Sequence, residues 1–444
     1  MNNFYLEAKP KHIEGVSPLT IFVFICGFFA SQRFSLDGIN VFICILPYIF
    51  FVYYLLSYKL DIALSLFLIS LFLICDNGGG IYSETPTILR YIIYVSGLLL
   101  LGYLSRPKIA HRKLIFIISL SVVLLITTLS SQMLFFDTTT FRRDILAFII
   151  LFLALTNRSE VEPSLFLLAA TSLGFLFGEL VNVYLFFNYS NDYMNYNSLK
   201  SFIVFPFLYA ALIKKNSLIA IVLFFLTVLV LVNYGSRTLI GSFFLLLLIA
   251  YTINKFKLLQ ATLMLIVLAS LLIAVNIYDL PTFDTDLSRY KVVVFFFNVL
   301  NFIGNLDFLG TLQTLDLVRF SENQLFFSRP FFEVIFGSGL GSGLVDTQGL
   351  LGFVGYYDTA YSAEELNSGV YFGLHDFWTD FGLRFGFLTV ILLTYFVSIK
   401  QMLLGRPVCG VLFCILLLNA FFSTAGMIFT ALIIKFYPTE MHST

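Results

Sequence analysis

The chain has 444 residues, and its 26 basic and 26 acidic side chains give a formal net charge of zero. Hydrophobic residues make up 59% of the sequence and charged residues 12%, and the mean hydropathy is +0.93. This composition excludes an ordinary soluble domain and is typical of a polytopic membrane protein. We therefore expect a lipid bilayer, and no nucleic acid, as partner.

Long apolar runs follow one another along most of the sequence. A helix that spans a bilayer needs about 20 mostly apolar residues, within a range of roughly 17–25. Candidate runs lie at 17–31, 39–58, 60–75, 87–104, 114–130, 143–157, 163–187, 198–213, 217–233, 238–253, 259–277, 377–399, 408–422 and 425–436. The last two could form one bent helix. The sequence thus predicts an all-α polytopic integral membrane protein with about 12–14 transmembrane helices, 14 being preferred.

One long stretch interrupts this pattern. We expect transmembrane helices 1–11 in residues 1–278, a long loop with short helices in 279–374, and the C-terminal transmembrane helices in 375–444. The first run is expected to be a spanning helix rather than a cleaved signal peptide, with no soluble domain before or after the membrane region. All five cysteines lie in apolar runs without disulfide or metal spacing, so we predict no metal site and no cofactor.

The basic residues are sorted between the two sides of the membrane. If the N-terminus is cytoplasmic and all 14 runs cross, short cytoplasmic loops contain 15 of the 26 basic residues, of which 11 are lysine. The positive-inside rule then predicts cytoplasmic termini and an external long loop. The external side is instead rich in arginine: Arg33, Arg90, Arg142, Arg143, Arg237, Arg289, Arg319, Arg329 and Arg384.

Arginine binds phosphate oxygens two at a time and stays charged, so this set favours an anionic ligand at the outer face. The alternative is that the arginines pair with external carboxylates such as Asp144 and Glu322.

Three motifs contain the candidate site residues. Arg237 lies at the external end of a predicted span, in Tyr234–Gly241. Arg319 and Arg329 precede a glycine-rich turn that begins Gly337-Ser338-Gly339, and such turns can bring backbone amides to an anion.

His375 lies where the chain enters the next span, and it is the only histidine expected outside. Its imidazole could act as a general base at physiological pH. Aromatic side chains suited to stacking on a glycan surround these motifs: Tyr356, Tyr357, Tyr361 and Trp378. They could equally pack the loop against the membrane.

Taken in order, these motifs resemble the bacterial O-antigen polymerase and O-antigen ligase superfamily, the Wzy/WaaL group. The resemblance covers 234–386: a basic helix end at Arg237, Arg319 opening a motif, Gly337-Ser338-Gly339 about 18 residues later, and His375 followed by the glycine pattern 382–386. Asp376 departs from the asparagine common in that family, and Arg384 is an unusual charge in the glycine pattern.

The resemblance implies a GT-C-like membrane glycosyltransferase that acts on an undecaprenyl-diphosphate-linked oligosaccharide, with its active site at the periplasmic face of the bacterial inner membrane. It implies that Arg237 and Arg319, with Arg384 or Arg329, hold the diphosphate. His375 would deprotonate the acceptor hydroxyl in an inverting, metal-independent transfer. It also allows a chain-length regulator protein as a partner.

Two alternatives remain open beside the O-antigen polymerase that we favour. An O-antigen ligase would transfer the glycan to the lipid A core instead. A transporter or flippase of lipid-linked sugars would need ionisable groups near mid-membrane, and Glu179 is the clearest candidate for one.

Overall fold

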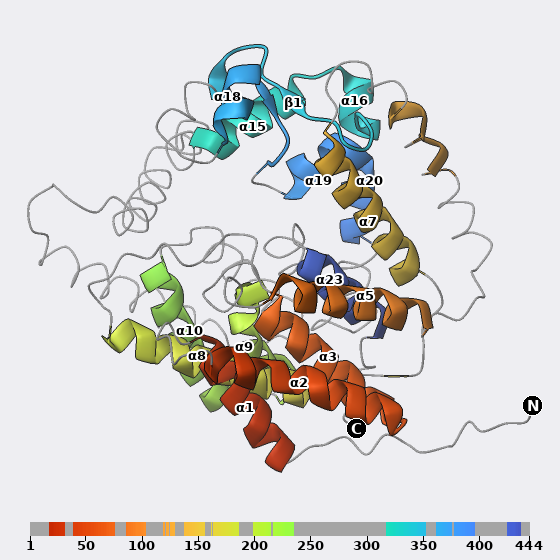
Figure 1. The fold of residues 1–444 in the computed structure, drawn as a ribbon. Coiled ribbons are helices and arrows are strands. Elements are labelled where there is room, and N and C mark those ends of the chain that lie inside the picture. The colour runs from red at the N-terminus through yellow and green to blue at the C-terminus, as the bar shows by residue number, and fades with distance from the viewer. Residues whose placement is uncertain are drawn as a thin grey trace, which may run out of the picture.

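The computed structural model is predominantly helical, which confirms the all-α prediction (Figure 1). It describes residues 17–31, 39–75, 86–103, 137–155, 163–185, 199–214, 216–234, 317–351, 361–374, 377–395 and 424–436, with a few residues between 119 and 128 and Val161. The predicted spans 238–253, 259–277 and 408–422 lie outside these residues, as do the site residues Arg237, Tyr356, Tyr357 and His375.

Most predicted spans that fall within the described residues are helical. In chain order these are α1 (Pro18–Ser31), α2 (Ile39–Leu56), α3 (Leu60–Ile74), α5 (Thr87–Tyr103), α7 (Thr138–Leu155), α8 (Leu165–Leu185), the segments η1 (Leu199–Val204), α9 (Phe205–Leu208) and η2 (Tyr209–Ile213), α10 (Ser217–Tyr234) and α23 (Thr424–Phe436). Among them, α7 begins five residues earlier than its apolar run, because Asp137 accepts a hydrogen bond from the N–H of Thr140 (2.6 Å).

Two of the described helices, over Ile39–Leu56 and Leu165–Tyr184, are long and apolar enough to cross a bilayer. Six further apolar helices in the described residues are shorter, and α3 is one of them. The number of transmembrane helices therefore stays a prediction.

Helix α3 forms the centre of the larger hydrophobic core. Every residue from Ala63 to Ile74 is buried, so the helix has no polar face and is surrounded by other helices. Beside it, helices α1 and α8 pack closely against each other because each has a glycine at their crossing. A Cβ on Gly27 would lie 2.0 Å from the carbonyl oxygen of Thr171, and a Cβ on Gly174 would lie 2.0 Å from that of Phe24.

The described part of the long loop has a core of its own. It contains α15 (Leu317–Phe327), α16 (Phe331–Phe336), α18 (Ala363–Ser368) and the short strands β1 (Leu344–Val345) and β2 (Val370–Tyr371). The strands pair antiparallel, with Leu344 opposite Tyr371. This smaller core includes Leu383 of α19 (Phe377–Phe385), so the loop packs directly on the helix that follows it.

The predicted span 377–399 is not one helix. Helix α19 ends at Phe385, Gly386 follows, and α20 (Phe387–Thr394) begins after it. The break is where α16 approaches, because a Cβ at position 386 would lie 2.3 Å from the carbonyl oxygen of Ile335. Figure 1 shows α15, α16, α18 and β1 at one end of the molecule, and α7 running from this group toward α5 and α23.

Candidate functional site

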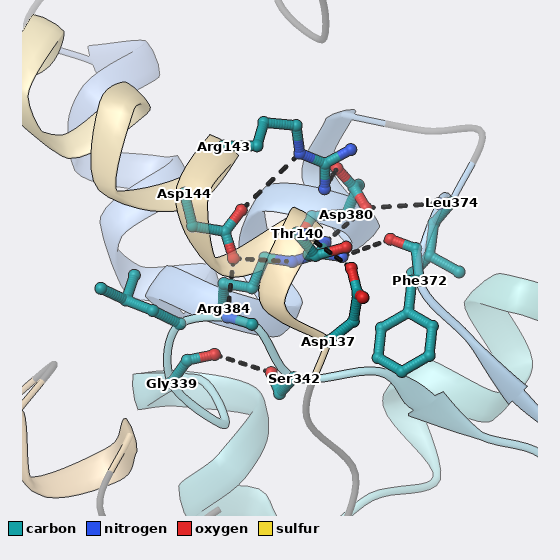
Figure 2. Close-up of polar contacts among 12 residues, drawn as sticks. Asp137, Thr140, Arg143, Asp144, Gly339, Ser342, Phe372, Leu374, Asp380 and Arg384 are labelled. Carbon is teal, nitrogen blue, oxygen red and sulfur yellow. Dashed lines mark hydrogen bonds and ion pairs between the residues drawn. The ribbon is translucent and has the colours of Figure 1, made fainter. Parts of the chain in front are cut away.

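Four charged side chains, three of them buried and Arg143 half-buried, form a network where α7, α19 and the glycine-rich turn meet (Figure 2). Asp380 and Arg384 lie one turn apart on α19, and Arg143 and Asp144 are neighbours in the first turns of α7. Helix spacing alone brings the first two together, whereas the pairing with α7 joins residues more than two hundred positions apart in the sequence.

Arg384 is the centre of this network, and its side chain is 1% exposed. Its Nη1 donates to the backbone oxygen of Asp380 (2.6 Å) and to Oδ1 of the same residue. Nη2 donates to the backbone oxygen of Phe372. Nε lies 3.2 Å from Oδ2 of Asp144, as an ion pair without hydrogen-bond alignment. A buried guanidinium is stable only when paired in this way.

The two aspartates connect the network to the surrounding backbone. Oδ2 of Asp144 accepts from the N–H of Gly341 (2.8 Å), and Oδ1 of Asp380 accepts from the N–H of Leu374 (3.2 Å). Nη2 of Arg143 donates to Oδ2 of Asp380 (3.3 Å), and its Nε lies 3.8 Å from Asp144 Oδ1. Two positive and two negative groups therefore alternate in a small volume, and their charges cancel.

A small cavity of about 20 Å³ borders the network, which is room for about one water molecule. Its lining comprises Arg143, Asp144, Ala147, Asp380, Phe381, Arg384, Phe385 and Met427. No group of three or more His, Cys, Asp or Glu side chains in the described ranges is arranged to hold a metal ion.

Asp137 lies at the edge of this site, at the start of α7. Burial would raise the pKa of its carboxyl group, but the backbone N–H of Thr140 and, more weakly, the charge of Arg143 hold this pKa below its usual value. Its own N–H donates to the carbonyl oxygen of Gly341 (3.1 Å). Asp137 therefore helps to join α7 to the glycine-rich turn.

The glycine-rich turn uses its amides for contacts within the protein. The N–H of Ser338 donates to the carbonyl oxygen of Leu383 (2.7 Å), and that of Gly339 to the carbonyl oxygen of Arg384 (3.3 Å). The N–H of Leu340 donates to Oγ1 of Thr128 (2.9 Å). Added to the bond from Gly341 to Asp144, these contacts dock the turn on α19, on α7 and on Thr128.

Gly337 and Gly339 are both required by this docking. Their φ angles are +82° and +92°, a backbone region that favours glycine. A Cβ at Gly337 would lie 2.4 Å from the carbonyl oxygen of Arg384, and one at Gly339 would lie 2.4 Å from the backbone nitrogen of Thr128. The predicted glycine motif is therefore a point of close backbone contact.

Arg319 lies on α15 and is partly buried. One turn along the same helix, Asn323 donates through its side chain to the backbone oxygen of Arg319 (2.8 Å). The Asn323 side chain also accepts from the indole N–H of Trp378 (3.2 Å), which lies in the first turn of α19 and is 36% exposed. Asn323 thus links the backbone of Arg319 to the side chain of Trp378, two residues predicted as diphosphate and glycan ligands.

Arg329 has a different environment. Its guanidinium forms an ion pair with Glu333 (2.5 Å) and donates to the hydroxyl of Ser338. Burial lowers the pKa of this guanidinium, and Glu333 partly offsets the effect. Arg143, Arg329 and Arg384 all pair with carboxylates, as the alternative explanation of the external arginines expects.

Tyr361 is buried within the core of the long loop, at 7% exposure. Its hydroxyl donates to Oε1 of Glu322, which is fully buried. Burial and the nearby Glu322 charge both raise the pKa of Tyr361. Its ring also stacks edge to face on Tyr371. In this position Tyr361 stabilises the core of the long loop.

His375 and the other unplaced site residues, Arg237, Tyr356 and Tyr357, lie outside the described part of the chain. Leu374, which directly precedes His375, is hydrogen-bonded to Asp380, and α19 begins at Phe377.

The sequence analysis overlooked Asp380 as a site residue and considered Asp144 only as a partner for arginine. The signal for Asp380 was its spacing of four residues before Arg384 in a predicted span.

No protein-family model, curated protein or solved structure matches this chain. Any functional assignment therefore depends on the chemistry of its own residues.

Proposed function

We propose that the chain is a polytopic membrane glycosyltransferase that joins undecaprenyl-diphosphate-linked oligosaccharide repeat units at the periplasmic face of the bacterial inner membrane, as an O-antigen polymerase. The observation that supports this proposal most is the adjacency of the motif segments. Helix α15, which carries Arg319, contacts the first turn of α19 through Asn323 and Trp378, and the turn at Gly337–Gly339 contacts the last turn of the same helix.

The proposed reaction needs a cationic site and a base. An acceptor hydroxyl attacks the anomeric carbon, the bond from that carbon to the diphosphate breaks, and the hydroxyl proton passes to His375. Lipid diphosphate leaves with its negative charges, which Arg237 and Arg319 would stabilise. Fixed cationic donors act most strongly in a site that excludes water.

The contacts of the other two arginines change their expected roles. Arg384 is buried and surrounded by its two aspartates, and Arg329 is paired with Glu333. We therefore assign the diphosphate to Arg319 and Arg237 first.

The transporter alternative depended on Glu179. That carboxylate accepts from the side-chain amide of Asn182 (3.1 Å), which also donates to the backbone oxygen of Ser31 (2.7 Å). These contacts link α8 to α1 and give Glu179 a structural role in the helix bundle.

A transferase and a transporter are separated by their products. Purified full-length protein in proteoliposomes would receive a synthetic lipid-diphosphate-linked repeat unit, and released undecaprenyl diphosphate would be quantified. A glycosyltransferase releases it in step with glycan transfer. Movement of the intact lipid-linked sugar across the bilayer, with no diphosphate released, would contradict the proposal and support the transporter.

A further inference from the structure

The backbone immediately before His375 is held by two side chains of α19. The guanidinium of Arg384 donates to the carbonyl oxygen of Phe372, and the carboxylate of Asp380 accepts from the N–H of Leu374 (3.2 Å). These two groups also bond to each other. One acid–base pair thus fixes an acceptor and a donor on either side of Gly373 (Figure 2).

We infer that Asp380 and Arg384 are positioning residues, which fix the segment leading into His375, and that Arg384 does not itself bind the diphosphate. The kinetic consequence rests on the proposed function, in which His375 is the base. The structural consequence, a fixed segment 372–374, does not.

The need for such a restraint follows from Gly373. This glycine is exposed, and a Cβ added to it would meet nothing within 4 Å, so neighbouring side chains do not restrict its backbone. Glycine has the widest range of backbone conformations, so without a restraint the chain would rotate freely about the φ and ψ angles of this residue. A base displaced by about 1 Å can lose on the order of 10²-fold in rate.

The positioning pair is itself connected to two other elements. Asp144 pairs with Arg384 and accepts from the N–H of Gly341, while Arg143 donates to Asp380. Segment 372–374, α19, α7 and the glycine-rich turn therefore share one buried network. Because Arg384 is 1% exposed, a diphosphate could reach it only if this network opened.

The test removes the pair without leaving an unbalanced charge. In the double variant Asp380→Ala/Arg384→Met one negative and one positive group are lost, and Arg143 can still pair with Asp144. Arg384→Lys is a milder second variant, because a lysine keeps the charge but cannot reproduce the planar fork that reaches Phe372 and Asp380 together. Glu179→Gln is the matched control, since it removes a buried carboxylate on α8, which is not part of the network.

Three quantities are measured on the full-length protein: amide hydrogen exchange of the peptide containing Leu374, affinity for the lipid-diphosphate-linked repeat unit, and its single-turnover transfer rate. We expect exchange at Leu374 to become at least about tenfold faster in both network variants, as loss of a buried hydrogen bond predicts. We expect the transfer rate to fall on the order of 10²-fold. Donor affinity should stay within about threefold of wild type, and Glu179→Gln should change none of the three.

Unchanged exchange at Leu374 would overturn the inference, because the segment would not depend on the pair. A loss of donor affinity equal to the loss of rate would also overturn it, since Arg384 would then bind the diphosphate. If wild-type protein transfers no glycan, the proposed function fails, while the exchange result still decides whether Asp380 and Arg384 fix this segment.

Discussion

At the scale of single residues, Arg384 and Gly339 both lie in close contact with other parts of the chain. Arg384 contacts two aspartates and the carbonyl oxygen of Phe372, and Gly339 lies against the backbone of Thr128. The sequence motifs predicted both residues as candidate ligand contacts. Their described surroundings are other parts of the same chain, so changes at either position affect the fold of the site before they affect a ligand.

Gly339→Ala should lower the free energy of unfolding by about 2–4 kcal/mol, because it adds an overlap with the Thr128 backbone to the strain of its positive φ. Thermal unfolding in detergent would measure the loss. Gly349→Ala is the matched control: Gly349 also has a positive φ (+70°), but an added Cβ would meet nothing within 4 Å. Equal losses in the two variants would show that docking of the turn contributes nothing.

Arg319→Ala and His375→Ala should each reduce glycan transfer by at least about 10²-fold. The first variant lacks a positive charge that stabilises the leaving diphosphate, and the second lacks the proposed general base. Both proteins should unfold at the wild-type temperature within a few degrees. Transfer by the purified variants is the measurement. Wild-type rates in either variant would remove that residue from the proposed site.

At the scale of helices and strands, the sequence predicted where helices form much better than how they pair. Apolar runs such as 39–58 and 163–187 correspond closely to α2 and α8, because apolarity over that length is a property of local sequence. The break at Gly386 was not predicted, because it depends on the approach of Ile335 from another helix. For the same reason the pairing of Asp144 with Arg384 was left as one alternative among several: nothing local specifies a contact across α7 and α19.

The crossing of α1 and α8 depends on the absence of side chains at Gly27 and Gly174. Gly174→Ala should destabilise the protein by about 1–3 kcal/mol, because its Cβ would overlap the carbonyl oxygen of Phe24 and force the two helices apart. Thermal unfolding of the detergent-solubilised protein would detect this change. Gly102→Ala in α5, where an added Cβ meets nothing within 4 Å, should be neutral or slightly stabilising. The contrary result, a neutral Gly174→Ala, would show that α1 and α8 do not pack in this way.

At the scale of the whole molecule, the described part of the long loop packs onto α19 of the helical body. The loop core contains both Val318 of α15 and Leu383 of α19, so candidate residues of the loop and of the helix that follows it belong to one packed unit. The sequence indicated these residues by motif order alone. It could not indicate that backbone N–H groups of the glycine-rich turn donate hydrogen bonds to α19 and α7, since those partners are distant in the chain.

Topology can be tested with single cysteines in a variant that lacks the native ones. A cysteine at the exposed Gln348 should react with a membrane-impermeant maleimide added to the periplasmic side, whereas one at the exposed Lys214 should react only after the membrane is permeabilised. Gel shifts of the labelled protein would give the two accessibilities. Reaction of both cysteines from the same side would contradict the predicted arrangement.

The central claim, that this chain polymerises lipid-linked repeat units, is tested most directly by the length of its products. Purified protein is incubated with the undecaprenyl-diphosphate-linked repeat unit as the only glycan, and the products are separated by size. The account predicts a ladder of lipid-linked chains that lengthen by one repeat unit per step. No chain growth under these conditions, together with a single transfer once a lipid A core acceptor is added, would contradict it and identify a ligase.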